Sequence, residues 1–366
     1  MLVKDLLLKN FRNYNLIKLE WHNKINIIVG NNAQGKSNIL EAINILGTGK
    51  SHRTNKDIDL IRWDQSDALI KAMIHNNNID YEAEVILKEG KKEFFINNNK
   101  LQKNNMVSTY FNTVLFCPED LMLVKGGPRE RRQFLDNEIS QVSPQYNSIL
   151  ADFKRVLLQR NNNLKRGLKG EQFDVWTNQL IHLGSQLIKK RLDTIEKLKP
   201  LSRLVCRKIT NGFENLELKY VSSVKNIGFD VSLSVLKEMY IQSLKEKNNE
   251  EYYQGITLVG PHRDDMIITI NGIDIRSFGS QGQQRTAALA LKLSELEYIK
   301  SEIGEYPILL LDDVFSELDN HRKTFLMDKV IDRIQTFITG TDLSGLTKEL
   351  TDQGIIYKVD NGSVNF

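Results

Sequence analysis

A glycine-rich segment near the N-terminus has the residue types and the spacing that bind nucleotide phosphates. The run Gly30-Asn31-Asn32-Ala33-Gln34-Gly35-Lys36-Ser37 matches the pattern G-x-x-x-x-G-K-[ST] at every specified position. Glycines let successive backbone N–H groups turn toward phosphate oxygens, a lysine reaches the β- and γ-phosphates, and a serine Oγ is a ligand for Mg²⁺. We therefore predict a site for ATP and Mg²⁺ formed by Gly30, Asn31, Asn32, Ala33, Gln34, Gly35, Lys36, Ser37 and Asn38.

A pair of carboxylates near the C-terminus is placed to complete this site. Asp312 and Asp313 follow the apolar run Ile308-Leu309-Leu310-Leu311, which is typical of a strand buried on both faces of a parallel sheet. Ligands bind at the carboxyl ends of such strands, so we predict that Asp312 joins Ser37 as a ligand of the Mg²⁺. Asp313 would hold or polarise the attacking water. The predicted catalytic residues are Lys36, Asp312 and Asp313.

The elements that must position these residues lie at both ends of the chain. Strand patterns over residues 6–8, 16–21 and 25–29 precede the glycine-rich segment, and a helical apolar pattern over 39–46 follows it. Because the two halves of one nucleotide site are so far apart in the sequence, both ends must fold together and the middle must be an insertion. We predict an α/β ATPase head from residues 1–117 plus 255–366, and an inserted, mainly helical arm domain from residues 118–254.

The inserted segment has the pattern of a helical hairpin. A helix with apolar residues at three- and four-residue spacing is predicted from near Glu171, and Pro200 is expected to end it. Residues 161–170 are rich in Asn and Gly, which predicts a turn between that helix and the one before it. A strand over 216–221 and a helix over 235–245 follow. The apolar repeat does not run through enough heptads for a long coiled coil.

Positive charge gathers in the same segment. The chain has 50 Lys and Arg against 46 Asp and Glu, a net charge of +4. Residues 118–212 hold 18 of these cations and 10 of these acids, a net +8, which leaves −4 for the rest. Such a basic region is typical of contact with a phosphate backbone, although cations on helices also serve simply as a solvated face. The predicted DNA contacts are Arg129, Arg131, Arg132, Lys189, Lys190 and Arg191.

Other classes of protein are disfavoured by the sequence. No apolar stretch approaches the roughly 20 residues that span a bilayer, and the first residues lack the layout of a secretory signal, so we expect a cytoplasmic protein with no membrane partner. Cys117 and Cys206 have no disulfide or metal-site spacing, which predicts two buried thiols. His262 is expected to be structural rather than a catalytic base.

A further motif resembles the signature motif of ABC-type ATPases. Ser280-Gln281-Gly282-Gln283 stands in place of the usual Ser-Gly-Gly-Gln and opens a long helical pattern. A hydroxyl and a glycine backbone at a helix N-terminus can bind an anion. In the ABC class this motif serves the γ-phosphate held by the partner protomer. Ser316-Glu317-Leu318-Asp319 is similar to the D-loop that crosses the same dimer interface.

Four more phrases narrow the resemblance. Leu8-Lys9-Asn10-Phe11-Arg12-Asn13-Tyr14 is similar to the opening of the SMC, Rad50 and RecN type of DNA-maintenance proteins. Together with Phe116–Leu121, Gly127–Asp136 and Gly260–Asp265, it makes the chain, up to about Asp342, resemble the RecF family of bacterial recombination and replication-repair ATPases.

The resemblance implies an ABC-type head with an inserted helical arm that binds ATP and Mg²⁺. It implies an ATP-dependent homodimer, weak and slow DNA-stimulated hydrolysis, and clamping of DNA at gaps or junctions. It also implies work with RecR and RecO in recombinase loading, and SOS induction. On matching motif positions, it adds four nucleotide-binding residues, Arg12, Ser280, Gly282 and Gln283.

Two departures from the wider ABC pattern keep other functions open. Asp313 stands where transporters have a glutamate, one methylene longer, so water activation is expected to be poorer. Residues 339–342, Thr-Gly-Thr-Asp, offer no switch histidine, so either Thr339 or Thr341 senses the γ-phosphate or no residue does. One alternative is therefore a nucleotide-sensing scaffold with negligible turnover. The other, an ABC transporter ATPase subunit, is disfavoured by the altered signature.

Overall fold

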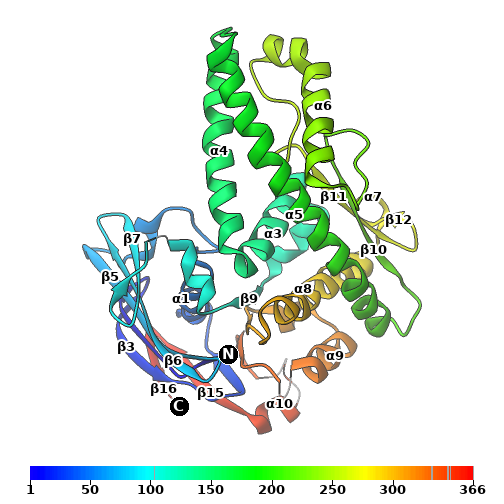
Figure 1. Ribbon diagram of the computed structural model, residues 1–366. Coiled ribbons are helices and arrows are strands. Elements are labelled where there is room, and N and C mark those ends of the chain that lie inside the picture. The colour runs from blue at the N-terminus through cyan, green and yellow to red at the C-terminus, as the bar shows by residue number, and fades with distance from the viewer. Residues whose placement is uncertain (103, 331–332, 344–345, 347, 366) are drawn as a thin grey trace. The chain divides into compact units, whose positions relative to one another are not determined.

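The computed structural model describes residues 1–102, 104–330, 333–343, 346 and 348–365, and these form a mixed α/β chain. The described chain divides into two compact units. Figure 1 colours the chain from its N-terminus to its C-terminus. The first unit combines Met1–Asp120 with Glu295–Phe366, so both ends of the chain fold together. The second unit is the intervening segment Leu121–Ser294.

An antiparallel sheet forms one layer of the first unit. Its strand order is β3-β2-β5-β6-β7-β8, and β1 also pairs with β5. Asn77 and Asn78 take positive φ in the turn between β5 and β6, as Asn97 and Asn98 do between β7 and β8, which is the conformation that tight hairpin turns require. The strands are β1 Leu2–Val3, β2 Asp5–Phe11, β3 Tyr14–Glu20, β5 Asp67–Asn76, β6 Ile79–Lys88, β7 Lys91–Ile96 and β8 Asn99–Lys100.

A mostly parallel sheet forms the second layer of this unit. Its order is β16-β15-β4-β14-β13-β9, with only the β15–β16 pair antiparallel. Every residue of β4 and β13 is buried, and for β13 this is the burial on both faces that the sequence predicts. The strands are β4 Ile25–Val29, β9 Thr113–Phe116, β13 Ile308–Leu311, β14 Thr336–Gly340, β15 Gly354–Asp360 and β16 Ser363–Asn365.

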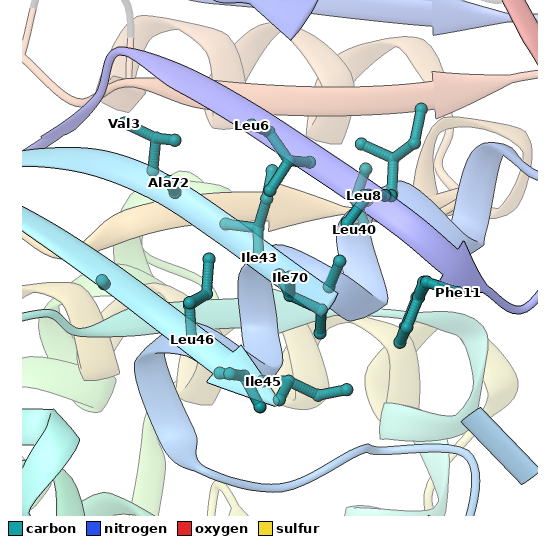
Figure 2. Close-up of a cluster of buried hydrophobic side chains, with 14 of the residues drawn as sticks. Val3, Leu6, Leu8, Phe11, Leu40, Ile43, Ile45, Leu46, Ile70 and Ala72 are labelled. Atoms are coloured by element: carbon teal, nitrogen blue, oxygen red, sulfur yellow. The ribbon is translucent and has the colours of Figure 1, made fainter. Parts of the chain in front are cut away.

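Helix α1 (Lys36–Thr48) supplies the core between these sheets. Its apolar side chains share one buried cluster with residues of both sheets, and Figure 2 shows part of that cluster. The labelled side chains come from the N-terminal strands, α1 and β5, and are Val3, Leu6, Leu8, Phe11, Leu40, Ile43, Ile45, Leu46, Ile70 and Ala72. This packing holds the N-terminus of α1 at a defined place beside the carboxyl end of β4. Two further helices of the unit are α9 (Asn320–Val330) and α10 (Lys348–Gln353).

The second unit is mainly helical. Figure 1 shows α4 and α5 running side by side from the short connection Arg166–Gly170. An antiparallel sheet, β10-β11-β12, packs with α5, and α8 begins in this unit and ends in the first. The elements are α2 Met122–Lys125, α3 Pro128–Val142, α4 Pro144–Lys165, α5 Glu171–Ile209, β10 Leu216–Val221, α6 Leu233–Gln254, β11 Asp265–Ile270, β12 Ile273–Asp274, α7 Ile275–Phe278 and α8 Gln281–Ile303.

The expectation that Pro200 ends its helix is wrong, because α5 continues to Ile209. Leu198 before the proline and Val205 and Cys206 after it are all buried. An internal proline costs a helix about 3 kcal/mol, and continued burial of this face against β10 offsets that cost. The predicted turn over 161–170 is likewise shorter, since α4 extends to Lys165.

Residues 255–294 belong to the second compact unit, whereas they were predicted to belong to the ATPase head. Strand pairing is the physical reason. All six residues of β11 pair in antiparallel register with β10, from Asp265 opposite Val221 to Ile270 opposite Leu216. Among the described residues, no helix has the length and apolar character needed to cross a bilayer.

Candidate nucleotide-binding site

The glycine-rich loop connects β4 to α1, as predicted, and its glycines are required by close packing. A Cβ on Gly30 would lie 2.3 Å from the carbonyl oxygen of Val359. Gly35 has φ +117°, and a Cβ there would lie 2.6 to 2.8 Å from atoms of Asn13 and Tyr14. Any larger residue would therefore displace the neighbouring backbone or side chains, so the tight loop depends on glycine at both positions.

The side chain of Lys36 folds back over this loop. Its buried ammonium group donates hydrogen bonds to the carbonyl oxygens of Gly30 (2.8 Å) and Asn31 (2.9 Å). The loop is also held from outside, because Asn13 Nδ2 donates to the Gln34 carbonyl (2.8 Å) and Tyr14 Oη donates to that of Gly35 (3.0 Å). The lysine is thus kept at the start of the loop, next to the backbone that would receive phosphate.

Ser37 and Asp312 meet although they lie at opposite ends of the chain. Ser37 Oγ donates to Asp312 Oδ1 at 2.8 Å. Asp312 directly follows β13, and parallel strands end at one edge of the sheet, which brings it to the N-terminus of α1. Thr339 on the neighbouring β14 also donates to Asp312 Oδ1, at 2.7 Å, and accepts the backbone N–H of Asp313 at 2.9 Å. The glycine-rich loop and the strand that ends at Asp312 therefore lie together in the structure.

Asp313 has an unusual backbone and an unusual environment. Its φ of +52° lies in the left-handed region that non-glycine residues seldom adopt. Partial burial, and then the neighbouring charge of Asp312, raise the pKa of Asp313 above its usual value, while Lys36 opposes them. A half-buried carboxyl with a raised pKa beside a phosphate-binding loop is the kind of group that takes part in proton transfer.

Arg12 is bound by Glu41, a residue that the sequence analysis missed. Arg12 Nε and Nη2 donate to the two oxygens of Glu41 at 2.8 and 2.7 Å, and the carboxylate is 0% exposed. Ser51 Oγ also donates to it (2.5 Å), and Arg53 Nη1 lies 3.9 Å away. The available signal was spacing: Glu41 is the one acid in the mostly apolar helical run 39–46 and lies one turn after Ser37.

The signature-like residues begin α8, in the second unit. Ser280 Oγ accepts the backbone N–H of Gln283 (3.2 Å), and Gln283 Oε1 accepts that of Ser280 (3.0 Å). This reciprocal pair is a capping box, which satisfies two backbone donors at the helix start. Ser280 and Gly282 are exposed. The motif therefore has a structural role in this chain and is also open to a partner.

The structure does not support Arg131 and Arg191 as DNA contacts, because both are buried and paired with carboxylates. Arg131, 4% exposed, donates to both oxygens of Asp265 at 2.7 and 2.9 Å. Arg191, 2% exposed, donates to Asp136 (2.8 Å) and to the Pro261 carbonyl (2.6 Å). Removing a buried charge from its partner is costly, so neither guanidinium is available to a phosphate.

The other four predicted DNA contacts differ in how far they are exposed and paired. Arg132 is half-buried and donates to the Asp264 carbonyl (2.8 Å). Lys189 pairs with Asp193 (3.0 Å), whereas Arg129 and Lys190 are exposed. Cys117 and Cys206 are buried thiols, as predicted.

His262 belongs to the same interior as the paired arginines of the second unit. Its Nε2 lies 3.1 Å from the carbonyl oxygen of Thr257, and burial lowers the pKa of His262 to about 4. A histidine that stays neutral in this way fits a structural role, as expected.

A P-loop joined to a buried parallel strand that ends in aspartate is the core of a P-loop nucleotide-binding fold. The family model for the RecF/RecN/SMC N terminal domain matches residues 2–363. The chain is 47% identical to the DNA replication and repair protein RecF of Halothermothrix orenii and 42% identical to that of Bacillus cereus strain AH820, each over 100% of this chain and 98% of the relative. The chain belongs to the RecF family.

Solved structures agree with this assignment. A structure of the recombination mediator protein RecF-ATPrS in the RecFOR pathway has a TM-score of 0.92 at 37% identity, covering 100% of this chain and 97% of that one. A second, of RecF-ATP, has a TM-score of 0.90, again at 37% identity, with 99% and 96% covered. An Smc head domain from Pyrococcus furiosus, 16% identical, has a TM-score of 0.56 over 99% of this chain and 95% of that one, which is a likeness of fold.

Proposed function

We propose that this chain is an ATP-dependent DNA-binding protein of recombinational repair and replication-fork maintenance, with weak ATPase activity. The observation that carries the proposal is the 2.8 Å hydrogen bond between Ser37 and Asp312, which joins the two halves of a nucleotide site. Support comes from relatives named as RecF DNA replication and repair proteins and from RecF structures described with ATP.

The loop and α1 would bind the triphosphate. Backbone N–H groups of residues 30–37 and the N-terminal end of the helix dipole favour an anion, and Lys36 adds a full positive charge. A Mg²⁺ ion fits this site, because Ser37 and Asp312 place a hydroxyl and a carboxylate oxygen side by side, the hard oxygen ligands that Mg²⁺ prefers. When bound, the ion would neutralise charge on the phosphates.

A second copy of the chain would complete each site. Ser280 and Gly282 are exposed at the N-terminus of α8, where backbone donors and the helix dipole suit a γ-phosphate held by the other protomer. Gln283 would keep the serine oriented through the capping box. Binding of ATP would then favour a dimer that clamps DNA, and hydrolysis would separate it.

Hydrolysis would use Asp313 as the carboxylate that holds the water. The raised pKa of Asp313 makes it a stronger base than an ordinary aspartate, but its left-handed backbone and short side chain restrict its reach. The same two features favour the second candidate, a nucleotide-sensing scaffold with negligible turnover. Of the two candidate threonines, Thr339 rather than Thr341 is placed to sense the nucleotide state, because its hydroxyl already forms hydrogen bonds with Asp312 and the Asp313 backbone.

The proposed partners are DNA at gaps or junctions, and RecR and RecO, with action in recombinase loading and SOS induction in the cytoplasm. Arg129, Arg132, Lys189 and Lys190 remain proposed DNA contacts from the sequence analysis. The RecFOR pathway in which the similar structures are described is consistent with these partners.

Purified protein tests the proposal by ATP hydrolysis and sedimentation with and without gapped DNA. We expect ATP to produce a dimer, DNA to raise turnover, and Lys36→Ala to abolish ATP binding. Lys18→Ala removes an exposed lysine of β3 in the same unit and is the control that should behave as wild type. A Lys36→Ala variant that binds ATP normally would refute the assigned site.

A further inference from the structure

The C-terminal half of α5 carries an unbalanced positive charge. Between Lys189 and Lys208 it has eight cationic side chains and two acidic ones. Figure 1 shows α5 as the long helix beside α4 in the second unit. The charge is not spread evenly around the helix, because burial separates one face from the other.

One face of this helix is apolar and buried, and the other is basic and exposed. Leu192, Ile195, Leu198, Val205 and Ile209 form the buried face, which packs with β10. Arg191 also points inward, where Asp136 neutralises it. The exposed cations recur on the opposite face at spacings that keep them on one side of a helix, and they are Lys190, Lys197, Arg203, Arg207 and Lys208.

Two lysines of this half-helix are paired with acidic side chains of the same helix. Lys189 pairs with Asp193 (3.0 Å), and Lys199 pairs with Glu196 while its ammonium lies 3.7 Å from the centre of the Phe229 ring. By contrast, Lys190, Arg203 and Lys208 have no carboxylate partner in the described part of the chain. Arg207 donates to the neutral amide oxygen of Asn215 (2.8 Å). We call Lys190, Arg203, Arg207 and Lys208 the α5 basic stripe.

A neighbouring helix shows what an ordinary solvated face looks like in this unit. Helix α6 has three lysines and four glutamates, and its charges are partly paired, as in Lys247 with Glu250. Its Glu246 also pairs with Lys225. Complementing the helix dipole explains cations in the last turn, such as Arg207 and Lys208, but not Lys190 or Arg203 further from the end.

We propose that the α5 basic stripe binds the phosphate backbone of duplex DNA. The proposal rests on the DNA-binding function above and names the surface for it. From Lys190 to Lys208 a helix rises roughly 27 Å, which equals the axial rise of about eight phosphates of one strand, at about 3.4 Å each along the duplex axis. No aromatic side chain lies in the exposed stretch from Lys189 to Lys208, so the contact is to backbone rather than to stacked, unpaired bases.

The test replaces all four stripe residues by glutamine, which removes charge but keeps a good helix former. Binding of a duplex of about 30 base pairs is measured by anisotropy over a series of salt concentrations. Each phosphate contact contributes about 0.9 to the slope of log K against log salt, so we expect the slope to fall by about 3 to 4. A control with the same loss of charge replaces the exposed or half-exposed lysines Lys154, Lys165, Lys237 and Lys245 of α4 and α6.

The outcomes separate this proposal from the one on which it depends. A stripe variant whose salt slope and affinity equal those of the control overturns the surface, even if wild-type protein binds DNA well. Wild-type protein that fails to bind DNA with or without ATP refutes the DNA-binding function itself. Arg203→Lys with Arg207→Lys retains the charge and should keep the wild-type slope, while unchanged ATP affinity in every variant shows that the head is intact.

Discussion

Arg12 and Glu41 form a two-pronged ion pair, at 2.8 and 2.7 Å, in which the carboxylate is completely buried on the P-loop helix. Arg12 has φ +53°, a strained value for a side chain of its size. The pair therefore fixes the turn between β2 and β3 against the helix that begins at Lys36. Asn13 and Tyr14 of the same turn bond the P-loop carbonyls, so Glu41 acts on the loop through this turn.

Glu41→Gln should weaken ATP binding by tenfold or more. The change keeps the side-chain volume but leaves the Arg12 guanidinium without its charge partner. Breaking a largely buried ion pair costs about 3 to 5 kcal/mol, and a loss of about 1.4 kcal/mol in binding free energy is a factor of ten in Kd. Nucleotide titration measures the effect. Asp80→Asn breaks the exposed pair with Lys4 in the same unit and should leave the ATP Kd unchanged. Equal affinities in the two variants would argue against a positioning role for Glu41.

Ser280→Arg should leave ATP binding intact but block ATP-driven dimerisation, because a bulky cation would occupy the place of the exposed hydroxyl. Sedimentation with ATP provides the measurement. Loss of the capping box should also cost about 1 kcal/mol of helix stability. Ser280→Thr keeps a hydroxyl cap and should dimerise. Normal dimerisation of Ser280→Arg would rule out the composite site.

Turnover should fall as the pH is lowered, and at a higher pH than an ordinary aspartate would give. Asp313 must be ionised to accept a proton, and partial burial together with Asp312 raises its pKa, so its basic form is lost earlier on acidification. Asp313→Asn should trap the ATP dimer and remove this dependence. Undiminished hydrolysis by Asp313→Asn would exclude the residue from the mechanism and favour another base.

Arg191→Met should lower the free energy of unfolding by about 3 to 5 kcal/mol, because Asp136 and Tyr146 lose a buried charged donor. Urea denaturation followed by circular dichroism measures it. Arg155→Gln removes an arginine that is 72% exposed and paired with Asp152, so its cost should stay below about 1 kcal/mol. A small effect of Arg191→Met would mean that the buried network is not an important source of stability.

Acidification from about pH 7 to pH 5 should destabilise the second unit through His262. The folded pKa of about 4 lies below the unfolded value of 6.5, so the unfolded chain binds the extra proton and stability is lost as the pH falls through this window. The loss should reach about 2 kcal/mol at pH 5. His262→Gln should flatten the dependence in urea titrations. An equally steep slope in that variant would assign the effect to other groups.

The candidate nucleotide site could be predicted from the sequence, because its chemistry depends on local patterns. The G-x-x-x-x-G-K-S loop, the strand ending at Asp312 and the helix opening at Gln281 are recognisable from spacing and periodicity alone. These patterns also required both ends of the chain to fold together, since a lysine and serine in one segment need a carboxylate from the other.

Which charged side chains are available to a ligand depends instead on the tertiary structure. Lys190 and Arg191 are neighbours in the sequence, yet one is exposed and the other is buried against Asp136, because successive helical residues point in directions about 100° apart. The burial of Glu41 and the helical course of the chain through Pro200 likewise depend on packing partners distant in the sequence. Burial and ion pairing arise from three-dimensional neighbours, so no local pattern could assign them.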